Sequence, residues 1–220
     1  MVERKFDEEL NELNNKLLKM ATFAQESISL SIDALKKRDK ALAEKIVEND
    51  KVIDRLELAI DDYSIELLAR RQPLAGDLRF ITTGIKLNGE LERIADLSVN
   101  IAHRAMDLSD KPVLKPLVDI PIFGKLAVQM VSKTIDAFIK RDAALATEVI
   151  KMDSEANRLR TLIQKELVDE YITKDVNTVS RALSLFLVAQ HLERICDHAK
   201  YIAEGVIYMV EAKVVKHRKD

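Results

Sequence analysis

The sequence contains few of the residues that break helices, cross-link a chain or build loop-based active sites. Its 220 residues include one cysteine, five glycines and four prolines, and tryptophan is absent. The single cysteine, Cys196, excludes an internal disulfide. There is no Gly-x-x-x-x-Gly-Lys phosphate loop, His-Glu-x-x-His zinc motif, Gly-x-Ser-x-Gly nucleophile motif or Glu-x-x-His di-iron motif. These absences argue against an enzyme of any of the corresponding classes.

Strong charge of one sign and long apolar runs are also missing. The net charge is −2, and no run of lysine and arginine lies among aromatic residues, so nucleic acid is not an expected partner. The longest apolar stretches, such as residues 183–189, are far shorter than the roughly 20 residues that cross a bilayer. The first residues lack the apolar core of a signal peptide. We therefore expect a cytoplasmic protein that reaches a membrane only through partners.

Between its few prolines and glycines the sequence shows helical periodicity. Apolar residues recur at spacings of three and four from Leu87 to Leu108, interrupted only by Ser98, and again from Leu185 to Met209. This spacing is typical of the packed face of a helix. The predicted helices lie near residues 3–37, 39–70, 77–108, 121–140, 142–171 and 175–214.

Two aspartates and one proline-rich segment mark the turns between these helices. Asp39 and Asp142 each follow a Lys-Arg pair and precede a new amphipathic run, so both are predicted to cap helix N-termini in tight turns. Residues 109–121 contain three prolines and cannot continue a helix, which predicts a crossover there. The basic tail after Val215 is predicted to be frayed.

An internal repeat relates the two halves of the chain. Residues 32–39 match 135–142 at an offset of 103, and residues 91–96 match 192–197 at an offset of 101. The two-residue difference between these offsets falls in the loop before the third helix of each repeat. We therefore predict an all-α fold of two pseudo-symmetric three-helix bundles produced by duplication. The expected limits are 1–110 for the first repeat, 111–120 for the crossover and 121–220 for the second repeat.

Two acidic pairs lie at equivalent places in the repeats. Glu92 and Asp96 are one helical turn apart, as are Glu193 and Asp197, and each pair lies nearly opposite the core stripe of its helix. Such carboxylates repel each other, and hard metal ions prefer oxygen ligands. Each pair is a candidate metal seat, with a solvated acidic face as the alternative. A further row on the second predicted helix could add ligands or simply be solvated: Asp50, Asp54, Glu57 and Asp61.

Other polar residues near these pairs are predicted to have structural roles. His191 and His198 lie about a third of a turn from the acidic pair of the last helix, so they do not obviously join it. Arg93 and Arg194 are expected to form salt bridges across the bundle. Cys196 is expected to be a small buried thiol rather than a nucleophile.

Together these motifs make the sequence resemble the PhoU family, the bacterial and archaeal regulators of phosphate uptake. The resemblance covers essentially the whole chain, and it depends on several phrases in combination. These phrases are Pro73–Arg79, Leu91–Asp96 with Asn100–Ala102, His191–His198, Tyr201–Glu204 and Tyr208–Val210.

The resemblance implies that the Glu-x-x-x-Asp motifs hold multinuclear metal clusters on the protein surface. It does not distinguish iron, zinc, nickel, manganese or magnesium. The implied ligands are Glu92, Asp96, Glu193 and Asp197, and the further candidates are Asp50, Asp153 and Asp77.

The resemblance also implies a non-enzymatic negative regulator. It would couple the ATPase subunit of a phosphate ABC transporter to a membrane sensor histidine kinase on the cytoplasmic side, and we expect a homodimer. The second repeat has Asp175–Thr178 in place of an Asp-Leu-Arg phrase and Tyr201 in place of Asn100, so two metal sites completed there should differ in metal number or affinity. Two alternatives stay open: a metal-dependent enzyme with a carboxylate-bridged cluster, and a purely structural helical scaffold.

Overall fold

Six long helices make up most of the fold. The computed structural model describes the backbone of residues 2–214 and the side chains of residues 5–214, so the predicted tail after Val215 lies outside the described residues. In chain order the elements are α1 (Val2–Lys37), α2 (Lys40–Arg71), α3 (Ala75–Ser109), α4 (Asp119–Lys140), α5 (Ala143–Leu167), the π-helical turn η1 (Val168–Ile172), the 3-10 turn η2 (Val176–Thr178) and α6 (Val179–Glu211). This part of the chain contains no strand, which confirms the all-α prediction. None of these helices combines the length and apolar character needed to span a membrane.

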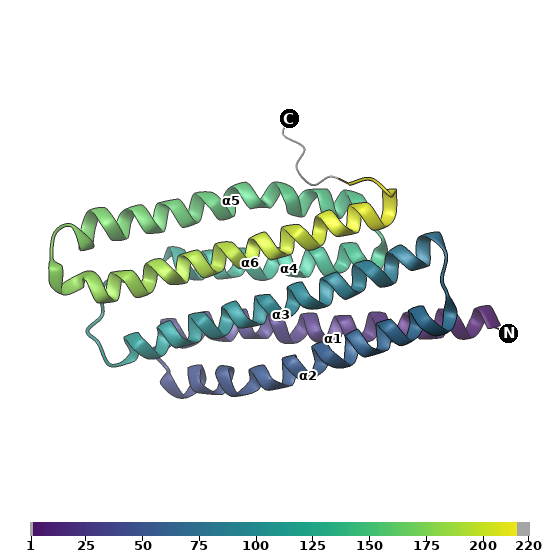
Figure 1. The fold of residues 1–220 in the computed structure, drawn as a ribbon. Helices are drawn as coiled ribbons and strands as arrows, with labels where there is room; N and C mark the ends of the chain where they lie inside the picture. The colour runs from purple at the N-terminus through teal and green to yellow at the C-terminus, as the bar shows by residue number, and fades with distance from the viewer. Residues whose placement is uncertain (1, 215–220) are drawn as a thin grey trace.

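The helices form two three-helix bundles that lie side by side (Figure 1). Helices α1, α2 and α3 make the first bundle, and α4, α5 and α6 make the second. α3 packs along α6 and α1 packs against α4, so these four helices join the bundles, while α2 and α5 lie on the outer flanks. The predicted pair of pseudo-symmetric three-helix bundles is confirmed, whereas the exact repeat limits stay a prediction.

Equivalent turns join the first two helices of each bundle. The side chains of Asp39 and Asp142 each accept a hydrogen bond from the backbone N–H three residues further on, at 2.9 and 3.0 Å. Both predicted N-caps are thereby confirmed. The residues just before them, Arg38 and Arg141, have φ angles of 58° and 52°, the left-handed conformation that ends a helix.

The predicted apolar stripes form the core. The stripe of α3 is buried from Leu87 to Ala105, and its one polar member, Ser98, donates a hydrogen bond to the carbonyl oxygen of Ile94 at 2.9 Å. Every residue of the α6 stripe is buried as well. Because these stripes face inward, the acidic residues on the other side of α3 and α6 are left toward the surface.

Three helix boundaries differ from the prediction. α4 begins at Asp119, because Pro121 is tolerated in a first turn, where its missing N–H has no partner within the helix. Between α5 and α6, residues 168–178 contain the π-helical and 3-10 turns rather than regular α-helix. α6 ends at Glu211, because Ala212 adopts a left-handed conformation with φ of 55°.

Candidate metal-binding edges

The acidic residues singled out in the sequence gather at two places, one in each bundle. The first acidic edge lies where α2 packs against α3 and consists of Asp50, Asp54, Glu57, Glu92 and Asp96. The second acidic edge lies where α5 packs against α6 and consists of Asp153, Glu193 and Asp197. All eight side chains are exposed or half-buried, so both edges reach the surface as predicted.

The carboxylates of the first acidic edge are close enough to repel one another. Burial first, and then the charges of three neighbouring carboxylates, raise the pKa of Glu92 to about 7. Burial, followed by two carboxylates of the same edge, raises the pKa of Asp50 to about 6. The pKa of Glu57 is raised for the same reasons. Carboxylates of the row on α2 therefore share one electrostatic environment with the pair on α3.

The first acidic edge has no cation of its own in contact with it. Within the described chain, none of its five carboxylates forms an ion pair with lysine, arginine or histidine. The amide of Asn88 ties α2 to α3 beside it, since Nδ2 donates to Asp61 Oδ1 at 3.0 Å and to the carbonyl oxygen of Glu57 at 2.9 Å. The helices are thus held together beside the edge, and the charge of Arg93 opposes the rise in the pKa of Glu57 and Glu92 without forming an ion pair with either among the described residues.

The second acidic edge contains two built-in cations. Arg160 Nη1 lies 2.5 Å from Glu193 Oε1, and Lys200 Nζ lies 2.8 Å from Asp153 Oδ2. Burial and Asp197 raise the pKa of Glu193, and Arg160 opposes that rise. The hydrogen bond to Asp153 raises the pKa of Lys200. Two of the three carboxylates of this edge are therefore paired with positive side chains, while burial and Asp153 raise the pKa of Asp197.

One buried oxygen of the second edge has no hydrogen-bond partner among the described residues. It is Oδ1 of Asp153, whose other oxygen, Oδ2, accepts from Lys200 at 2.8 Å and from Asn157 Nδ2 at 3.3 Å. This carboxylate is half satisfied by the protein itself.

Sequence reasoning did not single out Arg160 or Lys200. At the repeat offsets, Arg160 is equivalent to Glu57 and Lys200 is equivalent to Val99. The second repeat thus has a basic residue where the first has an acidic one, and another where the first has an apolar one. The signal that identifies them is a position-by-position comparison of the repeats, extended beyond the matching motifs to the positions that differ.

The two arginines that follow the motif glutamates behave differently from the prediction. Arg93 and Arg194 are exposed, and neither forms an ion pair with another described residue, so the expected salt bridges across the bundle are wrong. An arginine next to a surface glutamate on the same helix points to an adjacent face, where water solvates it. Cys196 is fully buried, as predicted, and burial raises the pKa of its thiol.

Asp77 lies apart from both edges. It is in the first turn of α3, fifteen residues before Glu92, which places it roughly 22 Å further along the helix. Its Oδ1 lies 3.8 Å from Nη2 of Arg141, in the turn between α4 and α5. Its metal-binding role stays a prediction, at a place that neither edge shares.

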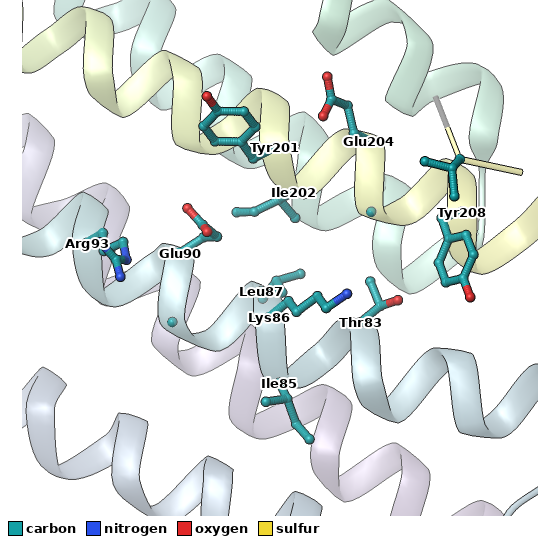
Figure 2. A pocket seen from close by; sticks show the side chains of 13 residues that line it. Thr83, Ile85, Lys86, Leu87, Glu90, Arg93, Tyr201, Ile202, Glu204 and Tyr208 are labelled. Carbon is teal, nitrogen blue, oxygen red and sulfur yellow. The ribbon is translucent and has the colours of Figure 1, made fainter. Parts of the chain in front are cut away.

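The groove between α3 and α6 holds a pocket of about 440 Å³, and its lining is separate from the Glu-x-x-x-Asp pairs (Figure 2). Glu90 points from α3 toward Tyr201 of α6 in this view, and its Oε2 lies 2.5 Å from Nδ1 of His198. Burial first, and then nearby arginines, lower the pKa of His191. Neither histidine forms an ion pair with Glu193 or Asp197 among the described residues, although the charge of His198 lowers the pKa of Asp197.

The donor atoms of the two edges suit a metal ion to different degrees. The first acidic edge offers five carboxylates, the ligands that hard divalent ions prefer, and no described lysine, arginine or histidine is ion-paired with them. The second offers three, of which two already contact cationic nitrogen atoms. Among the described side chains, no three or more acidic, cysteine or histidine groups converge on one point as they stand. The first edge therefore fits a cation by the chemistry of its carboxylates, and its side chains must turn for three or more of them to meet one.

Comparison with protein families gives a match in each bundle. The family model described as the PhoU domain matches residues 17–105 and residues 120–206. The two matches agree with the duplication found in the sequence.

Individual relatives match over nearly their whole length. A protein of Aquifex aeolicus named phosphate-specific transport system accessory protein PhoU homolog is 39% identical over 214 residues, covering 97% of this chain and 96% of the relative. The corresponding homolog 1 of Thermotoga maritima is 34% identical, covering 96% and 91%. A crystal structure of PhoU from Pseudomonas aeruginosa superposes with a TM-score of 0.90 at 35% identity, covering 94% of this chain and all of that one. The phosphate transport system regulatory protein PhoU of Streptococcus pneumoniae gives 0.89 at 26% identity, covering 96% and 99%.

Proposed function

This chain belongs to the PhoU family, and on that premise we propose that it regulates phosphate uptake and phosphate homeostasis without being an enzyme. The observation that carries the proposal is the match in sequence and structure to phosphate transport accessory and regulatory proteins. Because that match extends along nearly the full length of each relative, the role is proposed for both bundles together.

Negative coupling is the specific mode of action that we propose. The chain would bind the ATPase subunit of a phosphate ABC transporter and a sensor histidine kinase, and would lower uptake and signalling when phosphate is plentiful. Long exposed helix faces suit such a docking role. On the outer face of α2, for example, Leu58 and Ile65 are two turns apart and 62% and 60% exposed, which offers an apolar contact to a partner.

Metal binding at the acidic edges is the second part of the proposal. It is supported by the concentration of five carboxylates at the first acidic edge, none of which forms an ion pair with a described side chain. Glu92 and Asp96 from α3 and Asp50 from α2 would hold an ion there, and its positive charge would offset their repulsion. In this role the edge is a surface whose charge depends on metal supply.

The alternative of a metal-dependent enzyme is separable by experiment. The pocket between α3 and α6 is lined by neither Glu92 nor Asp96, so no observation favours a substrate site beside the proposed metal. Turnover of a phosphoester by the metal-loaded protein would nevertheless establish that alternative. The homodimer and the cytoplasmic location stay predictions.

Deleting the gene in its own host tests the proposed regulation. In phosphate-replete medium, we expect phosphate uptake and a phosphate-starvation reporter both to rise in the deletion strain, because the negative regulator is gone. Restoring the wild-type gene should bring both back down. If uptake and reporter are unchanged by the deletion, the chain does not act as a regulator of phosphate uptake.

A further inference from the structure

The two bundles carry different charges at equivalent positions beside their Glu-x-x-x-Asp pairs. Glu57 of α2 corresponds to Arg160 of α5 at the offset of 103, and Val99 of α3 corresponds to Lys200 of α6 at the offset of 101. A third exchange puts Asn157 where the first repeat has an aspartate. All three exchanges make the second acidic edge less negative than the first.

These cations are in contact with the acids rather than merely nearby. The side chains of Glu193 and Asp153 are only 12% and 15% exposed, and they lie 2.5 and 2.8 Å from the nitrogen atoms of Arg160 and Lys200. Charge-assisted hydrogen bonds to poorly solvated carboxylates are strong, and removing one partner leaves a costly unpaired charge. A metal ion that used Glu193 and Asp153 as ligands would compete with both cations for these carboxylates.

The unpartnered oxygen of Asp153 does not restore a metal seat. A cation that approached Oδ1 of this carboxylate would meet the ammonium group of Lys200, which contacts Oδ2 of the same group. Repulsion between the two positive charges would weaken binding there. The first acidic edge presents no such obstacle.

We propose that Arg160 and Lys200 take the place of a metal ion in the second bundle, so that this chain binds metal at the first acidic edge alone. The proposal deepens the proposed function and rests on its metal-binding part. The duplicated motif implies two metal sites, whereas this proposal assigns only one. The charge of the first acidic edge would then change with the concentration of available metal. The charge of the second acidic edge would be fixed by its own lysine and arginine side chains.

Metal counting on the full-length protein tests the difference between the edges. Mn²⁺ and Zn²⁺ are dialysed separately against wild type, the pair Glu92→Gln/Asp96→Asn and the pair Glu193→Gln/Asp197→Asn, with circular dichroism to confirm equal helicity. We expect the first double variant to bind either ion at least about tenfold more weakly, because it loses two ligands. The second double variant should bind as wild type does.

Reciprocal charge exchanges test the two cations directly. Glu57→Arg/Val99→Lys should abolish binding at the first edge, and Arg160→Glu/Lys200→Val should add binding at the second edge and a rise in Tm with metal. Glu48→Lys and Lys151→Glu are matched controls, because these exposed residues are equivalent in the repeat and also differ in charge. Both controls should leave metal binding unchanged.

The outcomes separate this proposal from the proposed function. Loss of binding confined to the first-edge variants supports both. Equal losses from the two double variants, or loss only from the second, would overturn the assignment of Arg160 and Lys200 while leaving metal binding intact. A wild-type protein that takes up neither ion would overturn metal binding and this proposal together, and the deletion experiment would still decide the regulatory role. If Arg160→Glu/Lys200→Val does not fold, the first-edge exchange still decides, because retained binding in Glu57→Arg/Val99→Lys contradicts the proposal.

Discussion

The two bundles have the same backbone plan and opposite ways of treating acidic residues at their outer edges. Their N-caps at Asp39 and Asp142 have the same geometry, and their third helices bury the same kind of stripe. At the edges, however, the carboxylates of the first bundle form no ion pair within the described part of the chain, whereas the second bundle pairs two of three with Arg160 and Lys200. Duplicated folds can therefore keep their helices while changing the electrostatic function of one copy, because surface charges are less constrained by packing than core residues.

The largest effect that separates the bundles should come from removing a cation of the second edge. Arg160→Gln leaves Glu193 half-buried and unpaired, so we expect the metal-free protein to lose about 1–3 kcal/mol of unfolding free energy, allowing for the partial exposure of Arg160. Urea denaturation measures it. Arg194→Gln is the matched control, since that exposed arginine forms no ion pair with a described residue, and its change should stay within about 0.5 kcal/mol. Equal effects from both substitutions would show that the ion pair has no special role.

The pH dependence of stability at Glu92, in the first edge, should come next in size. Burial and repulsion raise the pKa of Glu92 from its ordinary 4.5 to about 7, so between these values the folded protein binds more protons than the unfolded chain. Stability from this group is therefore lost as pH rises through that window. In metal-free protein, Glu92→Gln should raise unfolding free energy by about 1–2 kcal/mol at pH 8 and by much less at pH 5.

Thermal denaturation across this pH range measures the difference between wild type and Glu92→Gln. Glu48→Gln serves as a control, because Glu48 is an exposed glutamate of α2 outside the edge. A difference that does not change with pH would mean that burial and the neighbouring carboxylates do not raise the pKa of Glu92 as described.

Removing the equivalent N-cap from each bundle should reduce stability by similar amounts. Asp39→Ala and Asp142→Ala each remove one hydrogen bond to the first turn of the following helix, so each should destabilise the protein by about 1 kcal/mol. Chemical denaturation of both variants measures the two costs. A clear difference between the two losses of stability would show that the two turns are not energetically equivalent, despite their similar geometry.

The smallest effect is expected at the cysteine. Cys196 is buried where the first repeat has the buried Ala95, so Cys196→Ala should change unfolding free energy by less than about 1 kcal/mol. The native thiol should also react slowly with a thiol reagent, because it is buried and its pKa is raised. Rapid labelling of the folded protein would contradict this.

Helix positions and the core were predictable because they depend on local spacing. The stripes of α3 and α6 follow from residues three and four apart, and the caps follow from an aspartate placed before each amphipathic run. The end of α5 was less predictable, since the π-helical turn at residues 168–172 has no local signature in the sequence. Its geometry depends on the helices around it.

The outward position of the acidic pairs was also predictable, whereas their partners were not. Glu92 and Asp96 lie on the side of their helix opposite the core stripe, which places them at the surface. The packing of α5 against α6 decides which cation contacts Glu193. Arg160 is 33 residues away in sequence, and Arg194 is adjacent yet unpaired with described residues. Proximity in the chain was therefore a poor guide to ion pairing between helices.

Anomalous diffraction from crystals grown with Mn²⁺ tests the central claim most directly, because it locates each bound ion. The account predicts Mn²⁺ between α2 and α3, within reach of Asp50, Glu92 and Asp96, and none between α5 and α6. Mn²⁺ bound by Glu193 and Asp197, with Arg160 and Lys200 turned away from their carboxylates, would contradict it.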